Sequence, residues 1–146
     1  MKIVRVGRNE LVILGSFKKS RKILKKLREI FKRQKYRVRP YEKSKSNLKR
    51  FDFKRSDKLK ATRQISPGKK KKGRLHFSII RQKRGSIYME VHKDRYINGH
   101  FETHHKNSQA KREAKRMLNI IAKELNIKKS NIITITKSDL EGYIQE

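Results

Sequence analysis

The chain has no cysteine and few acidic residues. Among its 146 residues there is no Cys, which excludes disulfides, thiolate nucleophiles and Cys-based zinc sites. No apolar run approaches the roughly 18 residues that a membrane span needs. The N-terminus, from Met1 to Val6, has charges within its apolar stretch and no signal-peptide pattern. We therefore expect a protein of the cytoplasm, with the nucleus or a virus particle as alternatives, and no membrane partner.

The excess of positive charge is the dominant property of the sequence. The 43 Lys and Arg residues stand against 13 Asp and Glu residues, which gives a formal net charge of +30. A compact chain with this charge repels itself at moderate salt, and a polyanion relieves that repulsion. Binding to nucleic acid also releases counterions, which favours association without any reading of base sequence. Charge alone does not identify the partner, because acidic proteins and anionic membranes are negatively charged, as nucleic acid is.

The spacing of apolar residues predicts an α+β fold, made of small antiparallel sheets that are each covered by an amphipathic basic helix. Residues 1–40 form a unit of β-hairpin, helix and strand, residues 41–73 a basic and partly disordered linker, and residues 74–146 a three-strand meander, a helix and a final strand. The predicted strands are 3–6, 11–14, 36–39, 75–81, 86–96, 100–104 and 131–136, and the predicted helices are 18–34, 108–125 and a short one at 54–64. Asn98-Gly99 is the strongest turn signal, because both residues tolerate positive φ.

The basic face of the predicted helix 108–125 is the first candidate site. Lys111 and Lys115, and Arg112 and Arg116, form two pairs at i, i+4 spacing. Like charges at that spacing weaken an isolated helix slightly, so the pattern suggests a role outside folding, such as contact with phosphates. The alternative is a solvated face that aids solubility. Further phosphate contacts are predicted at Lys22, Lys25, Lys26, Lys69, Lys70, Lys71 and Lys72.

The start of this helix resembles a known family. Ala110-Lys111-Arg112-Glu113-Ala114-Lys115 resembles the Lys-Lys-x-Ala-Lys start of the last helix in double-stranded RNA-binding domains. The resemblance covers residues 74–126, including three antiparallel strands before the helix, and implies that Lys111, Arg112 and Lys115 bind phosphates across a groove. The sequence departs from the family at 102–106, which replaces a small, Gly-rich approach, and at 48–65, a poor candidate for the family's first helix.

A second resemblance is to a family of DNA-binding domains. Three strands followed by a helix, with Asn98-Gly99-His100-Phe101-Glu102-Thr103 leading into it, are similar to the arm-binding domains of tyrosine-recombinase integrases. That resemblance implies a sheet in the major groove of DNA. It would place Tyr88, His92, Arg95 and Tyr96 on the nucleic acid.

Aromatic and histidine side chains are the remaining candidates. Tyr88, His92 and Tyr96 share one side of a predicted strand, where they either stack on unpaired bases or cover the second side of the sheet. The histidines at 92, 100, 104 and 105 lie close to acids but match no zinc spacing, so we predict no metal and no cofactor.

The sequence therefore predicts non-catalytic nucleic-acid binding through phosphate-backbone contacts. Structured RNA is favoured over DNA, with a place inside a ribonucleoprotein as one setting. A DNA-binding protein of the recombinase-arm or genome-packaging type is the alternative. A small nuclease that uses His100 or His104 is the second alternative.

Overall fold

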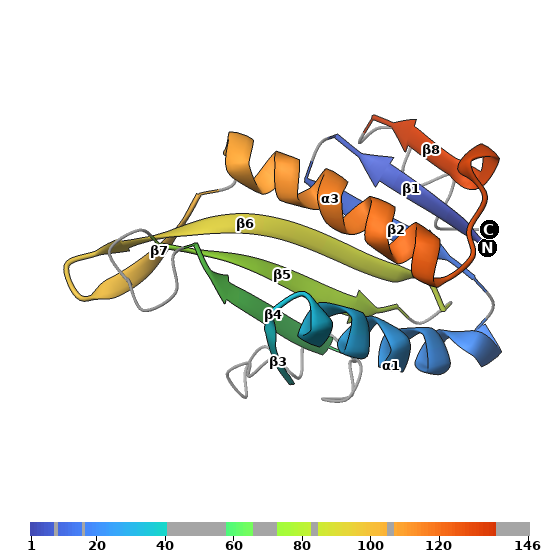
Figure 1. The fold of residues 1–146 in the computed structure, drawn as a ribbon, viewed down its shortest axis with the longest axis horizontal. Helices are drawn as coiled ribbons and strands as arrows, with labels where there is room; N and C mark the ends of the chain where they lie inside the picture. The colour runs from blue at the N-terminus through green and yellow to red at the C-terminus, as the bar shows by residue number, and fades with distance from the viewer. Residues whose placement is uncertain are drawn as a thin grey trace.

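The computed structural model describes residues 1–7, 9–15, 17–40, 58–65, 73–82, 85–104 and 107–136. Within these ranges, eight strands and two α-helices form an α+β fold (Figure 1). The elements are β1 (Lys2–Val6), β2 (Glu10–Leu14), α1 (Phe17–Arg33), β3 (Arg37–Pro40), β4 (Lys58–Gln64), β5 (Arg74–Arg81), β6 (Ile87–Ile97), β7 (His100–His104), α3 (Ser108–Glu124), the 3-10 turn η3 (Lys129–Asn131) and β8 (Ile132–Ile135).

The strands form one mixed sheet, and this corrects the prediction of separate small antiparallel sheets. The strand order is β3-β4-β5-β6-β2-β1-β8, with β7 also paired to β6. β2 pairs with β6 from Glu10↔Glu90 to Ile13↔Ile87. β8 pairs in parallel with β1, whereas the other pairs are antiparallel. A lone hairpin leaves unpaired backbone groups at its edges and is marginally stable in water. Pairing β2 with β6 joins the two ends of the chain in one sheet.

The segment between the two predicted units contains a strand. Residues 58–64 form β4, which pairs with β5 over seven residues, so the predicted short helix at 54–64 is wrong. Leu59 and Ala61 alternate with Lys58, Lys60 and Thr62, and the two apolar side chains are buried. The expected disorder of 41–73 therefore does not hold for 58–65. Its other residues, including Lys69 to Lys72, lie outside the described ranges, apart from Gly73.

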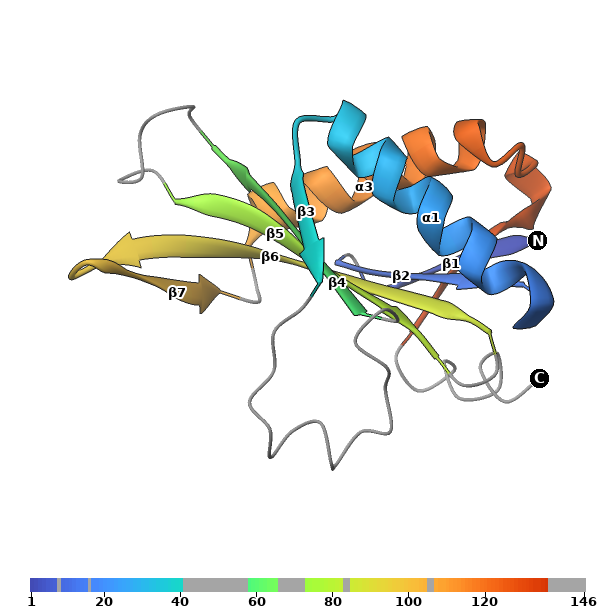
Figure 2. The same ribbon diagram turned by 90° about the horizontal axis from the view of Figure 1, so that it is seen from below.

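Both helices lie on the same face of the sheet (Figure 2). The apolar residues at helical spacing in α1 are at most 6% exposed: Ile23, Leu24, Leu27, Ile30 and Phe31. In α3 the buried face is Ala110, Ala114, Met117, Leu118 and Ile121. Asn107 caps α3, and its side-chain oxygen accepts hydrogen bonds from the backbone N–H groups of Gln109 and Ala110 at 2.9 and 3.3 Å. The cap therefore satisfies two backbone donors at the start of α3.

The core lies between the helices and the sheet. Phe31, Tyr36 and Phe77 pack edge to face, with ring centroids 4.9 to 5.6 Å apart. A second apolar cluster of Val4, Val6 and Val12 lies on the other face of the sheet. Tyr88 packs against this cluster, which agrees with the interpretation that it covers the second side of the sheet. The lysines of both helices are consequently directed away from the sheet, on its helix-covered side.

Candidate nucleic-acid interface

Helix α1 presents a dense row of cations to solvent. Lys22, Lys25 and Lys26 are exposed, and within the described ranges no salt bridge involves them. Glu29 is the one acid in this helix and lies 3.9 Å from Lys32. The apolar face of α1 packs on the sheet, so the remaining surface of the helix has a large excess of positive charge.

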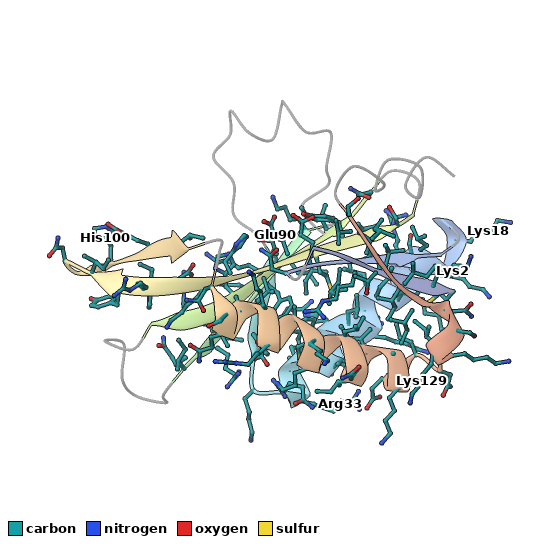
Figure 3. All side chains as sticks on the ribbon, turned by 90° about the horizontal axis from the view of Figure 1, so that it is seen from above. Lys2, Lys18, Arg33, Glu90, His100 and Lys129 are labelled. Atoms are coloured by element: carbon teal, nitrogen blue, oxygen red, sulfur yellow. The ribbon has the colours of Figure 1, made fainter. Side chains whose placement is uncertain are left out.

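The two helices contact each other through polar side chains. Arg33 donates to Glu124 at 3.1 Å, and Arg116 donates to the side-chain oxygen of Gln34 at 2.9 Å. Figure 3 shows Arg33 on the helix side of the sheet and Glu90 toward the opposite side. These contacts join the C-terminal end of α1 to α3, and both helices lie in one layer on the same side of the sheet.

An open groove of about 600 Å³ lies between the two helices. Its floor includes Ile30 and Leu125, and its walls carry Lys22, Lys25, Lys26, Glu29, Arg33 and Glu124. Both acids of the groove are paired, since Glu29 lies near Lys32 and Glu124 accepts from Arg33. The three lysines therefore dominate the charge that an approaching ligand meets.

The four predicted cations of α3 do not share one environment. Arg112 and Lys115 are exposed, and Lys111 is partly buried. Arg116 is different, because its guanidinium donates to the Glu113 carboxylate and to Gln34. The structure thus leaves Lys111, Arg112 and Lys115 facing outward, whereas Arg116 links α3 to the end of α1.

Glu113 is a buried carboxylate that the sequence did not single out. It accepts hydrogen bonds from the Tyr36 hydroxyl at 2.6 Å, from Arg63 at 2.5 Å and from Arg116. Burial opposes its ionisation, but these hydrogen bonds outweigh burial and lower its pKa to about 2. Burial and the bond to Glu113 raise the pKa of Tyr36. In the sequence Glu113 looks like an exposed residue within a basic segment, and its partners Tyr36 and Arg63 lie 77 and 50 positions away.

Asp94 is the corresponding buried carboxylate on the face of the sheet without helices. Its oxygens contact Arg74 Nε at 2.7 Å, His76 Nδ1 at 2.8 Å and the Thr103 hydroxyl at 3.0 Å. Burial opposes its ionisation, and the three partners together lower its pKa to about 2. His92 is buried beside His76, with ring centroids 5.0 Å apart. This network joins β5, β6 and β7.

The residues that were predicted to stack on bases or to contact DNA lie in different environments in the structure. Tyr88 is half-buried, with its hydroxyl 3.4 Å from Glu90, and burial together with Glu90 and Glu10 raises its pKa. Tyr96 instead lies in the β6–β7 hairpin and packs against Phe101 at 5.1 Å. Arg95, in the same hairpin, is exposed. Phe101 was not predicted as a site residue, because it becomes Tyr96's neighbour only through the strand register Tyr96↔Phe101.

The histidines of the nuclease alternative lie at this hairpin. His100 is exposed and its Nε2 is 3.2 Å from Glu102. The side chain of His104 is outside the described part of the chain. Among the described residues, no group of three His, Asp or Glu is arranged to hold a metal ion.

No described helix has both the length and the apolar character needed to cross a membrane. No protein-family model matches this chain, and neither curated proteins nor solved structures yield a similar protein.

Proposed function

We propose that the protein binds nucleic acid through its phosphate backbone, without catalysis, using the helix-covered side of the molecule. One observation supports this most directly. Two helices from different parts of the chain, both on the same side of the sheet, carry Lys22, Lys25 and Lys26 and the α3 cations Lys111, Arg112 and Lys115.

Unpaired positive charge favours this binding energetically. Exposed cations without a carboxylate partner repel one another, and like charges at i, i+4 weaken the helices that carry them. A polyanion removes this repulsion and releases counterions. Arg33 and Arg116 are excluded from the proposed phosphate contacts, because they already bind Glu124 and Glu113.

Structured RNA is our first choice of partner. The support is the resemblance of residues 110–115 to the phosphate-binding helix start of double-stranded RNA-binding domains. A setting inside a ribonucleoprotein fits the same chemistry. DNA binding of the recombinase-arm or packaging type is the alternative, supported by the exposed Arg95 on the hairpin.

The test compares duplex RNA, duplex DNA and single strands of one sequence over a range of salt concentrations. The variant K111E/R112E/K115E removes the α3 contacts, and K22E/K25E/K26E removes those of α1. The control K2E/R37E/R39E makes the same change in net charge at exposed cations of β1 and β3. We expect each helix variant to bind at least tenfold more weakly, with a salt slope flatter by roughly 0.9 per lost phosphate contact on duplex DNA.

Two results would overturn the proposal. One is a wild-type salt slope flatter than about −2, which means that few phosphates are neutralised. The other is an equal loss of affinity in the control variant, which means that net charge acts without any interface. The nuclease alternative is tested by digestion assays with and without chelator on H100A and H104A. Cleavage that these variants abolish would replace binding as the main function.

A further inference from the structure

The groove between α1 and α3 combines an aliphatic floor with positively charged edges. Ile30 and Leu125 form the floor. The α1 residues of the groove follow one another at spacings of three or four positions, so they lie along one side of the helix: Lys22, Lys25, Lys26, Glu29, Ile30 and Arg33. At about 1.5 Å per residue this stretch is roughly 17 Å long, or about three helical turns. The groove is therefore long enough to hold a short segment of another chain.

The charge that the groove offers to a ligand is positive. Lys22, Lys25 and Lys26 are exposed and have no ion-pair partner among the described residues. Both acids that line the groove are paired, one with Arg33 at 3.1 Å and one with Lys32 at 3.9 Å. Each lysine also has an aliphatic stem below its ammonium group, so the walls beneath the charges are apolar. A ligand that matches this groove has both negative charge and an apolar side.

The floor of the groove distinguishes an acidic protein from nucleic acid. Phosphates can bind the three lysines, but a phosphodiester backbone brings no apolar side chain to cover Ile30 and Leu125. Unpaired bases stack on aromatic rings or on Arg planes. The described lining of the groove has no aromatic residue, and its arginine, Arg33, is bound to Glu124. An amphipathic helix with Leu or Ile on one face and acidic residues beside that face matches the floor and the edges together.

We propose that this groove binds an acidic amphipathic segment of a partner protein. The aliphatic side chains of the segment lie over Ile30 and Leu125, and its carboxylates face Lys22, Lys25 and Lys26. This partner goes beyond the proposed nucleic-acid binding and does not depend on it, because the segment needs none of the α3 cations. Since both partners use the α1 lysines, the acidic segment displaces a duplex from α1 and thereby regulates nucleic-acid binding.

The experiment measures binding of the full chain to a fluorescent peptide of about 14 residues, with Leu along one helical face and Glu along the other. A control peptide has the same composition in an order that scatters the Leu residues, so that only the apolar stripe is lost. The protein variants are K22E/K25E/K26E at the groove, K111E/R112E/K115E on α3 and K2E/R37E/R39E on β1 and β3, which all change the net charge equally. A short RNA duplex is measured beside the peptides.

We expect the amphipathic peptide to bind wild type about tenfold or more tightly than the scrambled peptide, as the burial of one or two Leu side chains predicts. K22E/K25E/K26E loses this binding. The other two variants retain it to within about threefold, because they share only the change in net charge. In wild type the peptide also lowers the affinity for the RNA duplex, since the two ligands use the same lysines.

The peptide and the duplex test the two proposals separately. Equal binding of the two peptides, or an equal loss of peptide binding in K2E/R37E/R39E, overturns the groove proposal and leaves nucleic-acid binding intact. Peptide binding without salt-dependent binding to any RNA or DNA overturns the proposed function and supports the groove. A single-stranded RNA that binds more tightly than the amphipathic peptide, and is lost only in K22E/K25E/K26E, assigns the groove to nucleic acid and overturns the choice of an acidic protein.

Discussion

Two buried carboxylates, Asp94 and Glu113, each bind side chains from more than one part of the fold. Asp94 is 1% exposed and binds Arg74, His76 and Thr103. Removing one partner of a buried ion pair leaves the other charges uncompensated, which costs about 3–5 kcal/mol. We expect D94N to lower the free energy of unfolding at pH 7 by about this amount, measured by urea denaturation. The control E102Q changes an exposed acid of the same hairpin, and an equal loss in both variants would contradict this role.

The pH dependence of stability gives a separate test of Asp94. Its pKa is lowered in the folded state to about 2, so the folded state is favoured above the ordinary pKa of 3.8 and loses that stabilisation as the pH falls toward 2. The shift corresponds to roughly 2 kcal/mol. We expect the unfolding free energy of wild type to fall between pH 4 and pH 2 more steeply than that of D94N. Parallel pH profiles for the two proteins would show that Asp94 is not the group that titrates.

Glu113 connects α3 to β4 and to the residue that precedes β3 through a single side chain. Its carboxylate binds Tyr36 before β3, Arg63 on β4 and Arg116 on α3. We expect E113Q to lower the unfolding free energy by about 3–5 kcal/mol, because three buried or half-buried donors lose a charged acceptor. E124Q is the matched control, since Glu124 is half-exposed and its pair with Arg33 contributes at most about 1 kcal/mol. Equal losses of unfolding free energy in the two variants would show that the buried contacts of Glu113 stabilise the fold no more than an exposed ion pair does.

At the scale of helices and strands, local pattern predicted the positions of most elements but not the pairing of strands that lie far apart in the sequence. The predicted strands 75–81 and 100–104 and the helix 108–125 agree with β5, β7 and α3 to within one residue. Apolar periodicity reports burial, and burial determines where an element forms. It contains no information on which strand lies beside which, so the parallel pair of β1 and β8 was not predicted. The short helix at 54–64 was wrong because cross-strand pairing with β5 outweighs local preference.

The cations of α1 make that helix dependent on its surroundings. Lys18, Lys22 and Lys26 repeat at i, i+4 spacing, and such like-charged pairs destabilise an isolated helix by about 0.2–0.5 kcal/mol each. We expect a peptide of residues 17–34 to have little helix by circular dichroism at low salt and to gain helix when polyphosphate is added. In the K22E peptide both pairs become attractive, so its helix content should be higher without polyphosphate. Equal helix content in the two peptides at low salt would contradict this account.

One sheet joins the N-terminal strands to the C-terminal half, so the described parts of the chain should unfold together. β2 bonds to β6 and β1 bonds to β8, so the first 14 residues contact two separate strands of the C-terminal half. We expect one cooperative transition in urea, with coincident curves from far-UV and near-UV circular dichroism. I13A opens a cavity at the β2–β6 contact, where Ile13 is 1% exposed, and should shift both curves together by about 2–5 kcal/mol. Separated curves in either protein would show that the two halves unfold independently.

The net charge of +30 affects the stability of the whole folded molecule. Repulsion among the cations destabilises the compact state, and salt screens it, with a Debye length that falls from roughly 30 Å at 0.01 M to 10 Å at 0.1 M. We therefore expect the melting temperature to rise with sodium chloride over this range. If the repulsion is concentrated on the helix layer, K22E/K25E/K26E should melt higher than wild type at low salt, and more so than K2E/R37E/R39E. A melting temperature that falls with salt would mean that attractive ion pairs, not repulsion, dominate the electrostatics of the folded protein, and that a polyanion has no repulsion to relieve.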